Sequence, residues 1–209
     1  MTKRGAFTMG ALAALAATLS LPTMASADAV TDRIAKGQSH YEAGRLSAAA
    51  RELQWAIGRI KRRIATDIAK TFPDAPAGWT VRKARSSNRQ GVTMLQGLVV
   101  QRRYRQTGGR GTANAQLIAD NPMVSMMVMM FTNPAVAQNA GYEQVEVEGL
   151  PQGALIKFNE SRRSGEVVAM VGGRAFIKID ARNITDDKVL KGLIRGWKIA
   201  ALKGKLGLP

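Results

Sequence analysis

The spacing of apolar residues changes once along the chain, and this change separates a helical part from a strand-rich part. In residues 47–72, apolar side chains recur every three or four positions and share one helical face: Leu53, Ala56, Ile57, Ile60, Ile64 and Ile68. From Trp79 onward the period is two, which is typical of strands. Pro73 and Pro76 lie between the two patterns and are expected to end the helix. We therefore expect a helical region over 28–72, a linker over 73–78 and a second region over 79–209.

Two helices are expected in the first region, with Gly44 ending one and Ser47 starting the next. The second helix carries arginines largely off its apolar face. This hairpin resembles one tetratricopeptide repeat, because small and apolar residues occupy the packing positions of that repeat. They are Gly37, Tyr41, Gly44, Leu46, Ala49, Leu53 and Ala56. The likeness covers about 30 residues and occurs once, whereas a solenoid needs several stacked repeats. We therefore expect one helical hairpin that docks on the following domain.

The second region is expected to contain an antiparallel sheet. Strands are predicted over 92–105, 112–119, 142–148, 154–159, 166–171 and 175–180, with a glycine-rich connection at 108–111. A helix is predicted from Asp120-Asn121-Pro122 to about residue 131, and Asn133-Pro134 should end or kink it. A last helix is predicted over about 186–202, with Leu190, Leu193, Ile194, Trp197 and Ala201 on its apolar face. The expected fold class is α+β, an antiparallel sheet with helices on one face.

This order of elements loosely resembles the PsbP-like sandwich. The whole chain also resembles small exported bacterial proteins in which a Pro-x-Gly-Trp segment, here residues 76–79, follows a helical hairpin. Neither resemblance rests on a catalytic motif, so neither implies a function.

The first 27 residues have the features of a cleavable signal peptide. Lys3 and Arg4 precede an apolar run over about 11–21, and Ala25-Ser26-Ala27 has the form of a cleavage site. The run is shorter than the roughly 20 residues that a spanning helix needs. We therefore expect export to the periplasm or medium, a mature chain starting at Asp28, and no transmembrane span after cleavage.

The formal net charge of +16 falls to +14 once Lys3 and Arg4 are removed. A strongly basic protein attracts polyanions, so an anionic lipid, a polysaccharide or an acidic protein is an expected partner, although the charge could serve solubility alone. Two sets of basic residues are candidates for binding a polyanion. One is a stripe on the last helix, formed by Lys188, Lys191, Arg195 and Lys198. The other is a cluster on a predicted strand, formed by Arg102, Arg103 and Arg105. A further basic run lies at Arg59, Lys61, Arg62 and Arg63. Aromatic residues do not alternate with these groups, which disfavours nucleic acid as a partner.

The residues of enzyme chemistry are scarce. His40 is the sole histidine and the chain has no cysteine, which disfavours a zinc site and the usual pairs of nucleophile and base. The glycines at 108–111 lack the lysine and helix of a phosphate-binding loop. A carboxylate pair assembled from distant residues stays open. We expect a protein that is not an enzyme and needs no cofactor.

Methionines are concentrated in the helix predicted after Pro122. Met123, Met126, Met127 and Met130 would share a face, and their thioethers suit Cu(I). Valines and Phe131 alternate with them, so flexible core packing is the more common use of such residues. A deformable groove for a lipid or peptide is a third interpretation. The leading functional hypothesis is thus a non-enzymatic exported protein that binds or supports an anionic envelope component or protein. A Cu(I) or apolar-ligand carrier is the alternative.

Replacing Ala25 and Ala27 with bulky charged residues should block signal cleavage, because the peptidase pocket accepts small side chains. N-terminal sequencing of the protein from fractionated cells should then give a precursor for the variant and Asp28 for the unchanged chain. A protein that keeps Met1 after export would contradict the prediction.

Overall fold

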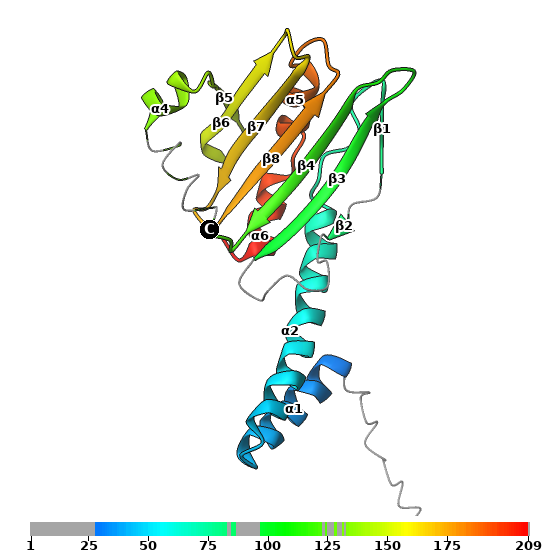
Figure 1. The fold of residues 1–209 in the computed structure, drawn as a ribbon, viewed down its shortest axis with the longest axis vertical. Coiled ribbons are helices and arrows are strands. Elements are labelled where there is room, and N and C mark those ends of the chain that lie inside the picture. Colours follow the sequence, from blue (N-terminus) through cyan, green and yellow to red (C-terminus); the bar gives the residue numbers. More distant parts are fainter. Residues whose placement is uncertain are drawn as a thin grey trace, which may run out of the picture.

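The computed structural model describes residues 28–82, 85–86, 97–122, 124, 128, 131 and 133–208. Two helices, α1 (Ala29–Glu42) and α2 (Leu46–Ala69), precede the sheet, and α5 (Lys188–Arg195) and α6 (Ile199–Leu206) follow it. Figure 1 shows the sheet at the end of a long helical hairpin, with α1 beside the part of α2 that is distant from the sheet. The expected α+β fold class is confirmed.

Eight described strands form one antiparallel sheet in the order β1-β3-β4-β8-β7-β6-β5, with β2 paired to β3. Their bounds are Trp79–Val81 for β1, Arg85–Ser86 for β2, Leu98–Gln106 for β3, Thr112–Ala119 for β4, Glu143–Val147 for β5, Leu150–Asn159 for β6, Ser164–Val171 for β7 and Ala175–Arg182 for β8. The last strand of the sequence, β8, pairs with β4 and β7 near the centre of the sheet. The two halves of the sheet therefore meet at β8, which is hydrogen-bonded to both.

The helices that hold the main core lie on one face of the sheet, as expected, and apolar residues also cover part of the other face. Side chains alternate along each strand, so Ile177 and Phe176 belong to different clusters. The inner face, with Leu117 and Ile177, packs against α5, α6 and the end of α2. The outer face packs Phe176 against Val124, and also contacts α4 (Pro134–Asn139). The described residues between β4 and β5 therefore form a partial second layer.

The end of α2 is anchored in the inner core. Phe72 is 1% exposed, and its ring centroid lies 4.3 Å from that of Trp197. The hydroxyl of Tyr104 donates to the Pro73 carbonyl at 2.7 Å, and the backbone N–H of Lys198 donates to the Thr71 carbonyl at 3.1 Å. Strand β3 and the C-terminal region therefore both contact residues 71–73, which directly follow α2.

The continuous last helix predicted over 186–202 is wrong, because the chain leaves the helix between α5 and α6. Trp197 turns into the core beside Phe72, and the Lys198 amide bonds to the end of α2. The helical phase changes at this break. Ile199 and Leu202 are therefore buried, whereas Ala201, predicted on the apolar face, is exposed.

The other strand predictions are confirmed with shifted ends, except that residues 92–96 lie outside the described part of the chain. Strand β6 begins at Leu150, inside a predicted loop, because Glu148 and Gly149 form a tight hairpin that pairs Val147 with Leu150. Gly149 has φ +79, which glycine adopts at no steric cost. The short strand β1 was missed, since the first strand was predicted to begin only at residue 92.

The helix expected before Asn133 falls mostly outside the described residues, although Val124, Val128 and Phe131 have helical backbone. All five of its methionines, Met129 included, lie outside them too. Asn133 begins the unpredicted helix α4, where its side chain accepts from the Val136 amide at 3.4 Å and Pro134 occupies the first turn.

Burial raises the pKa of Tyr104 to about 12, whereas the phenol of an unfolded chain ionises near 10. The unfolded chain therefore loses this proton first, so the free energy of unfolding should hold below about pH 10 and fall toward about pH 12. Urea unfolding across this range should show that Tyr104→Phe flattens part of the decline. Tyr41→Phe, at a phenol that is 68% exposed, is the matched control. Equal pH dependence in the two variants would contradict the prediction.

Candidate binding surface

Small residues bring α1 and α2 close together. A Cβ on Gly37 would lie 2.9 Å from the Leu53 side chain, so a larger residue there would force Leu53 to shift. Ala49 and Ala56 of α2 are buried along the same line of contact. The predicted helical hairpin is thus seen. Because α1 has a glycine at this contact, it covers only part of the apolar face of α2.

Large apolar side chains are left exposed on the hairpin. Eight such residues are exposed in the described part of the chain, and six of them belong to α1 and α2. We call these six the apolar flank: Ile34, Tyr41, Leu46, Leu53, Ile57 and Ile60. Tyr41 is 68% exposed and Leu46 62%, and both adjoin the turn at the end of the hairpin farthest from the sheet. Monomeric proteins rarely leave contiguous apolar patches uncovered without a binding role.

The six residues lie on one side of the hairpin. In α1, Arg33 and Ile34 fall on opposite sides of the line through Gly37, and in α2, Glu52 and Leu53 are separated in the same way. The guanidinium of Arg33 bonds Glu52 at 2.6 Å, which fixes that pair on one side. Ile34 must therefore share the other side with Leu53. The hydrogen bond from Arg33 also lowers the pKa of Glu52.

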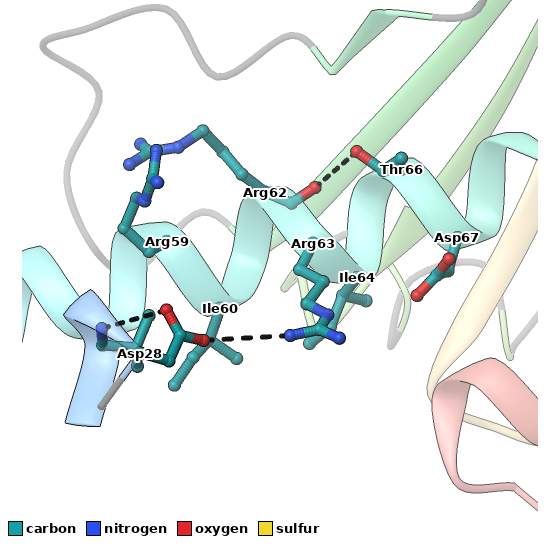
Figure 2. Close-up of a pocket in the computed structure, with 9 residues that line it drawn as sticks. Asp28, Arg59, Ile60, Arg62, Arg63, Ile64, Thr66 and Asp67 are labelled. Atoms are coloured by element: carbon teal, nitrogen blue, oxygen red, sulfur yellow. Dashed lines mark hydrogen bonds and ion pairs between the residues drawn. The ribbon is translucent and has the colours of Figure 1, made fainter. Parts of the chain in front are cut away.

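A groove of about 550 Å³ continues along α2 beyond the start of α1. Figure 2 shows the side chains of Arg59 and Arg62 reaching over the same side of α2, whereas Arg63 points toward Asp28, 4.0 Å away. The described lining residues are Asp28, Val30, Arg59, Ile60, Arg62, Arg63, Ile64, Thr66 and Asp67. Ile60 belongs both to this basic groove and to the apolar flank.

The two acids of the basic groove only partly offset its three arginines. Asp67 pairs with Lys70 at 2.6 Å, and this hydrogen bond lowers the pKa of its carboxyl. Asp28 accepts from the Val30 amide at 3.5 Å and faces Arg63 at the limit of ion pairing. The guanidinium of Arg59 lies 5.5 Å from the centre of the Trp55 ring. Anions can therefore approach Arg59 and Arg62 without displacing an ion pair among the described residues.

The lysine stripe predicted on the last helix does not form as expected. Lys198 lies beyond the break that follows α5, so it does not share a helix with Lys188, Lys191 and Arg195. Lys191 is half-buried and bonds Asp187 at 2.6 Å, while Lys188 lies 3.5 Å from Asp186. Arg195 and Lys198 are exposed. The predicted stripe is therefore split and partly neutralised.

The three arginines predicted on β3 have different surroundings. Arg103 and Arg105 are exposed, whereas the half-buried Arg102 faces the end of α2. Its guanidinium donates to the Ala69 carbonyl at 2.8 Å and to the Phe72 and Pro73 carbonyls at 3.4 Å. Cations at a helix C-terminus satisfy unpaired carbonyls and the helix dipole. Arg102 therefore has a structural contact that the sequence did not indicate.

Catalytic groups do not gather at these surfaces. Glu166 and Asp180 pair across β7 and β8, and Lys178 lies 3.8 Å and 3.0 Å from their carboxylates. Burial, followed by the hydrogen bond to Glu166, raises the pKa of Tyr142. A lysine shared by two carboxylates is an ion-pair network on a half-exposed sheet face. His40 accepts a hydrogen bond from Arg45 at 3.0 Å, and the described residues contain no group of three potential metal ligands among His, Cys, Asp and Glu.

Comparisons of this chain with protein-family models, curated proteins and solved structures found no match. The resemblances to a tetratricopeptide hairpin and to the PsbP-like sandwich stay predictions. Within the described residues, no helix is both long and apolar enough to cross a bilayer.

Leu53, Ile57 and Ile60 were predicted to lie on the apolar face of a hairpin that docks on the following domain. They are 39%, 46% and 42% exposed. The small residues Gly37, Ala49 and Ala56 were available as a signal of close helix contact. The extent of the uncovered face depends on where the sheet lies.

Arg102→Gln should lower the free energy of unfolding by about 1.5–3 kcal/mol, because it removes charged hydrogen bonds to buried carbonyls. Its neighbour Arg103 is exposed, so Arg103→Gln should change stability by less than about 1 kcal/mol. Urea unfolding of the two variants makes the comparison. Equal losses would show that the contact of Arg102 with α2 does not stabilise the fold.

Proposed function

We propose that this is an exported, non-enzymatic protein that attaches to an anionic membrane surface through the α1–α2 hairpin. The observation that supports it is the exposed apolar flank, which shares Ile60 with the basic groove that Arg59, Arg62 and Arg63 line. Helices that bind the membrane interface combine an apolar face with a basic polar face in this way. The attachment would be peripheral.

The arrangement of the hairpin supports an approach through its end farthest from the sheet. Tyr41 and Leu46 adjoin the turn there, and the exposed Arg45 lies between them in sequence. Tyrosine suits the membrane interface because its ring is apolar and its hydroxyl is polar. Burying a large aliphatic side chain contributes about 1.5–3 kcal/mol when complete. Each nearby basic residue adds about 1 kcal/mol at an anionic surface.

The apolar flank favours a lipid over the other expected anions. A polysaccharide could neutralise Arg59 and Arg62, but it would leave six large apolar side chains in water. An acidic protein could cover both features, so it is the competing partner in the experiment. The Cu(I) alternative would need Met123, Met126, Met127 and Met130, which lie outside the described residues.

The test is co-sedimentation of the exported protein, checked to begin at Asp28, with neutral phosphatidylcholine vesicles and with vesicles that contain phosphatidylglycerol. Binding should require the anionic lipid and weaken from about 0.1 M to 1 M salt, as the Debye length shortens. Joint replacement of Arg59, Arg62 and Arg63 by Gln should lower partitioning at least about tenfold. Tyr41→Ser with Leu46→Ser should lower it at least as much.

The matched charge control replaces Lys188, Arg195 and Lys198 by Gln, which removes the same formal charge from α5 and the start of α6. Equal loss in this control would show that net charge, not the hairpin, drives binding. Val136→Ser controls for loss of an exposed apolar residue outside the hairpin. Retention on an acidic protein with none on anionic vesicles would overturn the lipid proposal.

A further inference from the structure

A second hollow, of about 350 Å³, lies at the end of the sheet next to the turn between β7 and β8. It is lined by residues of the outer layer, the start of β6, the turn itself and α6. The described lining residues are Val128, Phe131, Leu150, Pro151, Gln152, Met170, Gly172, Gly173 and Lys203. We call it the sheet-end groove. The size falls within the range of about 300–1,000 Å³ that is usual for small-molecule sites.

The walls of the sheet-end groove are mainly apolar. Met170 and Phe131 belong to the cluster on the outer face of the sheet, while Leu150 belongs to the core of the inner face. The groove therefore passes around the end of the sheet, where the two layers meet. A linear apolar molecule could contact both clusters without entering either core.

Two adjacent glycines form part of the wall of the sheet-end groove. Gly172 and Gly173 have φ of +58 and +71, a region that glycine favours. A Cβ on Gly172 would come within 2.9 Å of Leu208. Leu208 is held there because its amide donates to the Lys203 carbonyl at 2.9 Å, after the left-handed Gly207 that ends α6. The same C-terminal turn therefore shapes the groove and fixes the backbone of Lys203.

Lys203 is the one charged residue among the described lining residues. It is half-buried, and the ion pairs of the described residues do not include it, whereas Lys191 and Lys178 both pair with carboxylates. Gln152 supplies the other polar side chain of the described wall. A half-buried ammonium beside an apolar wall is stabilised by an anion, because the pair offsets the cost of losing water.

We propose that the sheet-end groove binds a single-chain amphiphile with a carboxylate head, such as a long-chain fatty acid. The chain contacts Val128, Phe131 and Met170, and the carboxylate accepts hydrogen bonds from the Lys203 ammonium. Each buried methylene adds favourable transfer energy, whereas the lysine selects an anionic head over an alcohol. Few polar groups line the groove, which disfavours a sugar or a nucleotide. This proposal does not depend on the hairpin.

The experiment measures calorimetric binding of dodecanoate and dodecanol, below their micelle or solubility limits, to the exported protein. We expect saturable binding of dodecanoate at one site per chain. Lys203→Gln should weaken dodecanoate about tenfold or more and change dodecanol by much less. Lys205→Gln is the matched control, because Lys205 is exposed on the same helix and does not line the groove. Equal effects of the two lysine variants would overturn the proposal.

A second variant tests the apolar wall. Gln152 is exposed on β6, where a tryptophan is compatible with a strand, so Gln152→Trp should fill the sheet-end groove without unfolding the protein. Circular dichroism checks the fold, and binding of both ligands should be lost. Tyr41→Ser with Leu46→Ser should leave dodecanoate binding unchanged, which separates this site from the hairpin. Absence of saturable dodecanoate binding, or its persistence in Gln152→Trp, would overturn the proposal.

Discussion

The last turn of α2 enters the inner face of the sheet, and the rest of the architecture depends on that contact. Phe72 packs on Trp197 there, while Arg102 and Tyr104 of β3 bind the carbonyls at the end of the helix. The contact joins residues from three distant parts of the sequence. Trp197 lies in the break between α5 and α6, so the core contact with Phe72 is made where the C-terminal helix is interrupted.

This anchor also determines what the hairpin leaves exposed. Only the C-terminal end of α2 is part of the main core, through residues such as Ala65 and Ile68. Nearer the turn, α2 has α1 as its partner, and the close approach at Gly37 covers a narrow strip. A helix with a broad apolar face and a narrow partner must leave apolar area in water. That uncovered area, together with the nearby arginines, is the physical basis of the proposed membrane attachment.

The apolar flank and the sheet-end groove would serve different ligands because their shapes differ. The apolar flank is exposed along the hairpin and shares Ile60 with a groove lined by three arginines, so it suits an extended anionic surface. The sheet-end groove is concave and has one described cation, Lys203, so it suits a single chain with one negative head. Both proposals concern amphiphiles, yet they rest on separate elements of the fold.

The sequence alone implies the division into a helical hairpin and an antiparallel sheet, because the period of apolar residues depends on local backbone geometry. It also located most strands, since glycine and proline mark their ends. Tertiary contacts, however, set which side chains are buried and which are exposed. Arg102 cannot be distinguished in the sequence from the adjacent, exposed Arg103. In the fold, however, it contacts the end of a helix that lies 29 to 33 residues away in sequence. Local sequence patterns do not encode such distances, so the exposed part of the hairpin depended on how α2 meets the sheet.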